Sequence, residues 1–330
     1  MKRAVVVTVG SRSESLGAMK LARWLRRNQY DVAEQNGIDP LFDGGRDLYC
    51  FSAVFSWKLP DLVGMVNMAK HWGEVWIGGP AVTFHHRNAE YVRRETGIVP
   101  HVGLDDRFER EPGSYPMIYF SRGCPAYTPA CGNCPVPRIE GTAFRYYPEA
   151  TPAKFLLDNN LSALPAEYQE YIIGRYLSEW KKGKVDANSG FEPHTFTEET
   201  LRRWEKFPLH CWRFGYDDLT ERAEALAMMK LLREHGQTGE RVRVYCLIGN
   251  EPMDACHQRV REIIENGCHP WPQRLRPLDW LGGPLPTFHG WDEPTLIAFQ
   301  RFYSIAGLWK RMKPSEFFYQ GRYPLSHLNQ

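Results

Sequence analysis

The sequence has no long hydrophobic run. Its first residues, 1–9, begin with two basic side chains, but the apolar stretch that follows is far too short for the hydrophobic region of a secretion signal. Nothing in the 330 residues approaches the length that a membrane-spanning helix needs. We therefore expect a soluble, cytoplasmic protein with no membrane partner.

The chain also has little excess of charge of either sign. The formal net charge is +2 over 330 residues, too small to favour nucleic acid or an acidic surface as a partner. Basic residues interleaved with aromatic ones, typical of a nucleic-acid groove, are missing as well. The composition, 43% hydrophobic and 24% charged, is that of an ordinary globular protein with one large domain, or with a large and a small one.

Two cofactor motifs are absent from the N-terminal part. Residues 10–17, which follow the first apolar run, lack the G-x-G-x-x-G spacing of a dinucleotide site. The Asp-x-His-x-x-Gly signature of a cobalamin site is missing too. Cobalamin therefore stays a candidate cofactor that no motif supports.

Strand-like and helical patterns alternate along the chain. Apolar runs at 4–9, 47–57 and 74–77 alternate with amphipathic stretches, which indicates a small parallel α/β domain. Further strands are expected at 116–120, 154–158, 184–188, 209–214, 241–248 and 274–278. Further helices are expected at 166–182, 198–206, 220–235, 254–266 and 291–310.

The predicted fold is α/β, a partial (β/α)6 TIM-like barrel preceded by a small Rossmann-like parallel α/β domain. Six βα repeats in succession fit an open barrel better than a closed eightfold one. We place the Rossmann-like domain at 1–110 and the barrel at 111–285. Residues 286–330 are expected to form a helical and aromatic extension that packs on the barrel.

Eight cysteines are spread along the chain, but only one Cys-x2-Cys pair occurs. Cys124, Cys131 and Cys134 have the spacing Cys-x6-Cys-x2-Cys, in a loop that glycines and prolines keep out of regular structure. A structural zinc site takes four ligands, so here it would need a fourth Cys or His. An iron–sulfur cluster also usually takes four cysteines. A four-iron cluster held by three would leave one iron open to a ligand that is not protein.

Polar or strand-terminal residues mark the ends of the predicted barrel strands, where parallel α/β folds bind ligands. The candidates are, in chain order, Asp158 with Asn159 and Asn160, residues 188–192 from Asn188 to Glu192, residues 213–217 from Arg213 to Asp217, residues 249–251 from Gly249 to Glu251, and Arg276 with Asp279. Plainer interpretations exist for several of them. Residues 158–160 suit an Asx turn or a helix cap, and Glu192 suits a solvated loop. Arg213 lies in an apolar run, where a buried guanidinium needs a partner.

With these residues and the cysteine loop, the sequence resembles the radical S-adenosylmethionine (radical SAM) superfamily, in the branch with an N-terminal cobalamin-binding-like domain. The resemblance covers 116–280 well and 1–110 only in general layout. Its segments are 120–124, 134–141, 157–160, 186–192, 213–217 and 244–249. Three features depart from the family pattern. The first cysteine gap is six residues instead of three, Asn133 replaces an aromatic residue, and the Gly-Gly-Glu-type element of the second strand is absent.

The resemblance implies a 4Fe–4S cluster on Cys124, Cys131 and Cys134 whose open iron binds S-adenosyl-L-methionine. A flavodoxin- or ferredoxin-type protein would supply one electron. Cleavage of the sulfonium would then give a 5′-deoxyadenosyl radical that modifies an unknown substrate. The protein would supply positioning and electrostatics, and the cofactor the chemistry.

The resemblance also implies partners for the methionine part of S-adenosylmethionine. Asn159 and Asn160 would meet its amino group, with Asp158 as a countercharge. Arg213 would meet its carboxylate.

For the rest of the cofactor, Asn188 and Glu192 would meet the ribose hydroxyls or the sulfonium, and backbone groups of Ile248 and Gly249 the adenine. Two alternative functions stay open. One is a non-catalytic iron–sulfur or zinc-binding scaffold, and the other is a cobalamin-dependent radical SAM methyltransferase.

Overall fold

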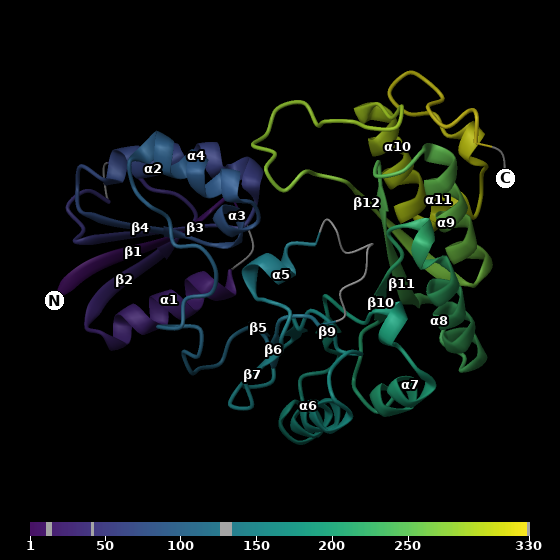
Figure 1. Cartoon of the computed structure of the whole chain (residues 1–330), viewed down its shortest axis with the longest axis horizontal. Coiled ribbons are helices and arrows are strands. Elements are labelled where there is room, and N and C mark those ends of the chain that lie inside the picture. Colours follow the sequence, from purple (N-terminus) through teal and green to yellow (C-terminus); the bar gives the residue numbers. More distant parts are fainter. Residues whose placement is uncertain (11–14, 41–42, 126–133, 329–330) are drawn as a thin grey trace. The chain divides into compact units, whose positions relative to one another are not determined.

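The protein is an α/β structure with parallel sheets (Figure 1), in a computed structural model that describes residues 1–10, 15–40, 43–125 and 134–328. The chain forms two compact units. Unit 1 contains Met1–Tyr115, Asn133–Thr151 and Pro277–Gly283, and unit 2 contains Pro116–Gly132, Pro152–Arg276 and Pro284–Gln330. Within the described part of the chain, every helix is too short or too polar to cross a membrane.

Unit 1 is built on one parallel sheet with the strand order β2-β1-β3-β4. Its strands are β1 (Lys2–Val9), β2 (Tyr30–Gln35), β3 (Leu48–Ala53) and β4 (Glu74–Gly78). The central strands β1 and β3 are apolar almost throughout because both faces of the sheet are covered. β2 was not predicted, since its sequence YDVAEQ is polar and the strand lies half-exposed at the edge.

Helices cover both faces of this sheet (Figure 1). On one face, α1 (Leu16–Arg27) packs against Ala4 and Val6 of β1. On the other face, Val5 and Val7 belong to a core with α2 (Leu59–Ala69), α3 (Pro80–Thr83) and α4 (His86–Thr96). The remaining elements of unit 1 are η1 (Ser56–Lys58), α5 (Val136–Ile139) and β7 (Arg145–Tyr146).

Unit 2 contains two parallel sheets of three strands each. Their strands are β5 (Met117–Ile118), β8 (Phe155–Leu156) and β9 (Asp186–Ala187) in the first, and β10 (Trp212–Gly215), β11 (Gly239–Ile248) and β12 (Cys268–Arg274) in the second. Two isolated parallel bridges, Val185 to Leu209 and Phe191 to Phe214, join the two sheets. The six strands therefore follow one another in chain order, and the described strands do not close into a barrel.

One face of the unit 2 strands packs against helices. Along β11, Val244 and Cys246 are fully buried, whereas the alternate residues Tyr245 and Leu247 are half-exposed on the other face. The helices are α6 (Ala166–Glu179), α7 (Glu198–Trp204), α8 (Arg222–Glu234), α9 (Met253–Glu265), α10 (Glu293–Ser304) and α11 (Ala306–Trp309). The shorter elements are β6 (Ser121–Arg122), η3 (Pro193–Thr195), η4 (Leu219–Glu221) and η5 (Pro314–Glu316).

The last strand differs from the prediction. It was expected at 274–278, but β12 covers Cys268–Arg274 and includes Pro270 and Pro272. The Leu275 N–H donates to the Ile248 carbonyl oxygen, so alternate residues of β12 direct their N–H groups toward β11. The two proline nitrogens therefore face the outer edge, where a strand tolerates them. Gln300 of α10 donates to the Pro272 carbonyl oxygen at 3.0 Å.

Candidate functional site

The cysteine loop follows the short strands β5 and β6. Gly123 has φ +87°, a left-handed conformation that glycine adopts without strain, and this turn redirects the chain just before Cys124. Cys131 lies outside the described residues. Cys124 belongs to unit 2, and Cys134, directly before Pro135 and α5, belongs to unit 1.

Accessibility separates two cysteines from the others that the structure describes. Cys124 and Cys134 are half-buried, whereas the other five are buried. Burial raises the pKa of Cys50, Cys246 and Cys268 to about 12 in each case, so these thiols stay protonated at neutral pH. Cys50, Cys211 and Cys246 lie in the core and behave as small buried hydrophobes.

Asp158 follows β8 and holds the start of the cysteine loop. Its side chain is 0% exposed. One carboxylate oxygen accepts from the Phe120 N–H at 2.9 Å, and the other accepts from the Ser121 hydroxyl at 2.6 Å. Tyr168 of α6 donates to the Phe120 carbonyl oxygen at 2.7 Å, so both backbone groups of Phe120 are bonded. Burial raises the pKa of Asp158 to about 6 against the effect of these hydrogen bonds, which lower it.

The next two residues contact the next part of the loop. The side-chain amide of Asn159 donates to the Gly123 carbonyl oxygen at 3.4 Å. The side-chain amide of Asn160 lies 3.7 Å from the Cys124 sulfur, as a donor to it. Residues 158, 159 and 160 thus form hydrogen bonds to successive parts of the segment 120–124. We call these three residues the β8 clamp.

Ser162 connects the β8 clamp to the loop that follows β9. Its hydroxyl donates to Asn160 Oδ1 at 3.0 Å and accepts from the Glu192 N–H at 2.9 Å. Thr195 Oγ1 lies 2.8 Å from the Ser162 hydroxyl oxygen. Sequence reasoning did not single out Ser162, because a serine in a polar turn gives no signal of such a contact.

Glu192 is a half-buried residue whose carboxyl group lies among other acids. Burial raises its pKa to about 7, and the nearby Glu221 and Asp217 carboxylates contribute. The His194 N–H reaches its Oε1 at 3.5 Å, which is a weak hydrogen bond. A carboxyl group that titrates near neutral pH can exchange a proton or bind a cation at this point.

Asn188, predicted beside Glu192, points outward. It is exposed, and its N–H donates to the Leu156 carbonyl oxygen at 2.9 Å within the first sheet. Among the described residues, the contacts that join the β8 clamp to Glu192 do not include the Asn188 side chain.

Arg213 has partners on the two neighbouring strands. Its guanidinium bonds Asp186 of β9 at 2.6 Å and the hydroxyl of Tyr245 on β11. The pair is mostly buried, and within the described residues Nε of Arg213 and Oδ1 of Asp186 have no hydrogen-bond partner. The sequence argument that this arginine needs a partner is confirmed, and the partner is a carboxylate of the chain itself.

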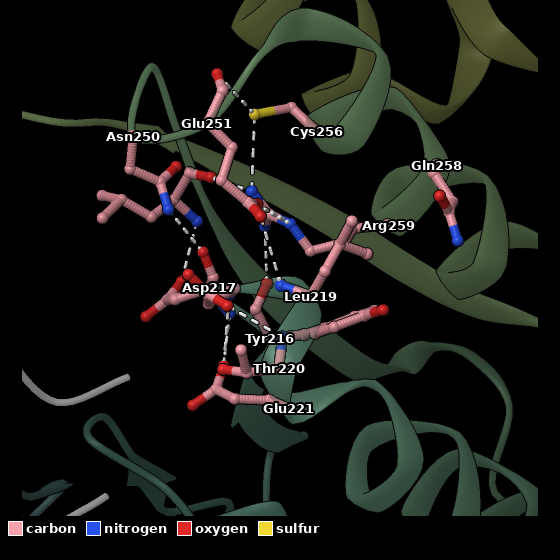
Figure 2. A network of polar contacts seen from close by, with 12 residues as sticks. Tyr216, Asp217, Leu219, Thr220, Glu221, Asn250, Glu251, Cys256, Gln258 and Arg259 are labelled. Atoms are coloured by element: carbon pink, nitrogen blue, oxygen red, sulfur yellow. Dashed lines mark hydrogen bonds and ion pairs between the residues drawn. The ribbon is translucent and has the colours of Figure 1, made fainter. Parts of the chain in front are cut away.

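Figure 2 shows a second polar network, at the carboxyl ends of β10 and β11. Its centre is Arg259 of α9, which is 0% exposed. Arg259 donates to the carbonyl oxygens of Tyr216 and Leu247, both at 2.7 Å, and to Glu251 at 2.9 Å. Asp217 accepts from the Leu247 N–H at 2.7 Å. We call this set the Arg259 network.

Ile248 and Gly249 lie beside the Arg259 network. Ile248 is fully buried, and its carbonyl oxygen accepts from Leu275 at 2.9 Å. Gly249 has φ +89°, and a Cβ there would lie 3.2 Å from Leu296. The left-handed backbone conformation favours glycine at this strand end, and a Cβ would also make a tight contact with the Leu296 side chain.

The structure thus brings part of the predicted set together. The β8 clamp, Cys124 and, through Ser162, Glu192 form one connected group. Arg213 bonds within the strands instead, and Ile248 and Gly249 belong to the end of β11. No group of three or more His, Cys, Asp and Glu side chains in the described ranges is arranged to hold a metal ion, and Cys131 is outside those ranges.

Comparison with protein-family models and with curated proteins finds no match to this chain.

Proposed function

We propose that this protein is a radical SAM enzyme in which Cys124, Cys131 and Cys134 hold a 4Fe–4S cluster with one open iron for S-adenosyl-L-methionine. In this proposal the six parallel strands of unit 2 correspond to a partial barrel. A flavodoxin- or ferredoxin-type protein delivers the electron, and the substrate is unidentified. The observation that carries the proposal is the β8 clamp, which holds residues 120–124 so that an accessible Cys124 stands at the carboxyl ends of parallel strands.

The contacts of Cys124 support its role as one ligand of such a cluster. Cysteine ligands of iron–sulfur clusters are thiolates and accept N–H···S hydrogen bonds, and Asn160 aims an N–H at the Cys124 sulfur. Both described loop cysteines are accessible, whereas the remaining cysteines that the structure describes are buried. When bound, the cluster supplies one electron to the sulfonium of S-adenosylmethionine.

The chain's own residues have separate tasks in this proposal. Asp158 is fully buried, so it acts on the cofactor through Phe120 and Ser121 rather than by contact. Glu192 offers a carboxyl group with a pKa of about 7 at the end of β9 and can hold a proton or a positive charge there. Arg213 is paired with Asp186, and among the described residues its Nε has no hydrogen-bond partner.

The test is reconstitution without oxygen, followed by iron and sulfide analysis and EPR spectroscopy of the reduced protein. We expect about four irons per chain, as in a 4Fe–4S cluster, and a spectrum that changes when S-adenosylmethionine is added. Alanine substitution of Cys124, Cys131 or Cys134 should abolish this signal. Cys50→Ala, which removes a buried thiol, is the matched control and should keep it.

Two results would contradict the proposal. Zinc in place of iron would make the loop a structural site, in line with a scaffold protein. A cluster with a spectrum blind to S-adenosylmethionine would show that no iron is open to that ligand.

A further inference from the structure

We propose that Asn160 is a positioning residue that directs its amide N–H at the Cys124 thiolate and thereby raises the reduction potential of the cluster. This inference rests on the proposed function, because it assigns a task to a residue beside the proposed cluster. It differs from the role that the resemblance implies, in which Asn160 meets the methionine amino group. Asn160 is 3% exposed, so little of its surface is available to a ligand.

The orientation of the Asn160 amide follows from its neighbours. The Ala163 backbone N–H lies 3.0 Å from one atom of the amide, and a backbone N–H only donates. That atom must therefore be the oxygen, Oδ1. The NH2 group then points the other way, where the Cys124 sulfur lies at 3.7 Å. Reversing the amide would bring two donors face to face at Ala163.

Ser162 adds a contact on the same side of the amide. Its hydroxyl oxygen accepts from the Glu192 N–H at 2.9 Å. Its hydroxyl hydrogen can be donated to Asn160 Oδ1 at 3.0 Å, to the Glu192 carbonyl oxygen at 3.2 Å or to Thr195 Oγ1 at 2.8 Å. The Ala163 N–H is therefore the donor that fixes the amide, which cannot reverse without losing that hydrogen bond.

An N–H donor affects the two redox states of a cluster unequally. Reduction adds negative charge, part of which appears on the cysteine sulfurs. A donor that faces a sulfur therefore stabilises the reduced state more than the oxidised state. Removing the donor should make the cluster harder to reduce.

The experiment compares midpoint potentials of reconstituted full-length protein by EPR-monitored redox titration. Asn160→Asp keeps the oxygen that accepts from Ala163 and replaces the donor by a negatively charged acceptor. We expect its equilibrium constant for reduction to fall at least tenfold, or about 60 mV for a one-electron couple. Asn160→Ala removes the donor without adding charge, and the expected fall is about three- to tenfold.

Asn266→Asp is the matched control. Asn266 caps the end of α9, just before the start of β12, and the substitution adds the same charge at the opposite end of these strands. Its potential should stay that of the wild type. Equal shifts of the midpoint potential in Asn266→Asp and Asn160→Asp would show that the added charge alone causes the change, and would overturn the proposal.

A second measurement tests the contact without a cluster. In the apo-protein, the side-chain amide NMR signals of Asn160, assigned by their loss in Asn160→Asp, should shift when Cys124 is replaced by alanine. Unshifted signals would overturn the inference, whatever the fate of the cluster. A wild-type protein that takes up no iron but shows the shift would instead refute the proposed function and leave the contact established.

Discussion

The two sheets of unit 2 stabilise their carboxyl ends in different ways. In the first sheet, β5, β8 and β9 are two residues long each, so few ladder hydrogen bonds hold them, and the β8 clamp ties the next loop to β8 by side chains. In the second sheet, β10, β11 and β12 have four, ten and seven residues. There a buried arginine from α9 binds the strand ends together.

The two polar networks therefore have different roles. The β8 clamp holds a loop in place, and the Arg259 network joins buried strand ends. The β8 clamp ends at Cys124, an accessible side chain, and at Glu192, which titrates near neutral pH. The Arg259 network ends in backbone carbonyls and in Glu251. Substitutions in the first should therefore change the site as well as stability, and substitutions in the second should change stability alone.

The largest effect is expected from Arg259→Met. It leaves Glu251 and the carbonyl oxygens of Tyr216 and Leu247 without their donor, and breaking a buried ion pair costs about 3–5 kcal/mol of unfolding free energy. Urea denaturation measures this loss. Arg261→Met, on the same helix with a half-exposed side chain, is the control and should stay within about 0.5 kcal/mol of the wild type. Similar losses in both variants would contradict a special role of Arg259.

The next effect is that of Asp158→Ala, which leaves the Phe120 N–H and the Ser121 hydroxyl buried without acceptors. We expect a loss of about 2–4 kcal/mol, since each unsatisfied buried group costs roughly 1–3 kcal/mol. Iron retention should fall as well, because the chain before Cys124 loses its anchor.

Asp254→Ala, in the exposed first turn of α9, is the control for Asp158→Ala and should change neither quantity appreciably. Wild-type iron content in Asp158→Ala would show that the β8 clamp does not support the cluster.

The third prediction is a pH dependence at Glu192. Its folded pKa of about 7 lies above the ordinary value of 4.5, so the folded state binds the proton more tightly than the unfolded state. The stability of the wild type should therefore fall as pH rises from about 4.5 to about 7. Glu192→Gln does not titrate, and relative to the wild type it should gain about 1–2 kcal/mol between pH 5 and pH 8. Urea denaturation at both pH values measures this gain, and an equal difference at both would contradict it.

The smallest effect is expected from Ser162→Ala, which removes the oxygen between Asn160 and the Glu192 N–H. The loss should be about 1 kcal/mol, that of a neutral hydrogen bond. Ser178→Ala, on the exposed face of α6, serves as the control. If both serines give the same value in urea denaturation, Ser162 is not a link between the two loops.

Much of the fold could be predicted from the sequence, because strands and helices of unit 2 have clear apolar periods. The strand at 241–248 and the helix at 254–266, for example, lie within one or two residues of β11 and α9. Two strands were not predicted correctly, for physical reasons. β2 is a polar edge strand, and β12 contains prolines that usually interrupt strands but are harmless on an outer edge.

The candidate site was harder to predict than the fold. The sequence placed Asp158 at a strand end, but whether a carboxylate faces solvent, a ligand or a neighbouring loop depends on packing that a single sequence does not encode. Arg259 illustrates the same limit. It lies in an amphipathic helix where arginine is typical of a surface, yet the structure buries it completely. Pairs such as Arg213 and Asp186 depend on the register of separate strands, which no local pattern reveals.

The proline pair of β12 has a consequence for how the molecule behaves in a crowded solution. An exposed strand edge is a template on which another chain can add a strand, and this is a common route to aggregation. On β12 the outer edge offers no N–H at Pro270 or Pro272, and Gln300 already occupies the Pro272 carbonyl oxygen. Among the described strands β12 is the last of the row, and its outer edge is thereby protected. β12 can therefore be the last strand of the sheet without offering a complete row of N–H and C=O groups to another chain.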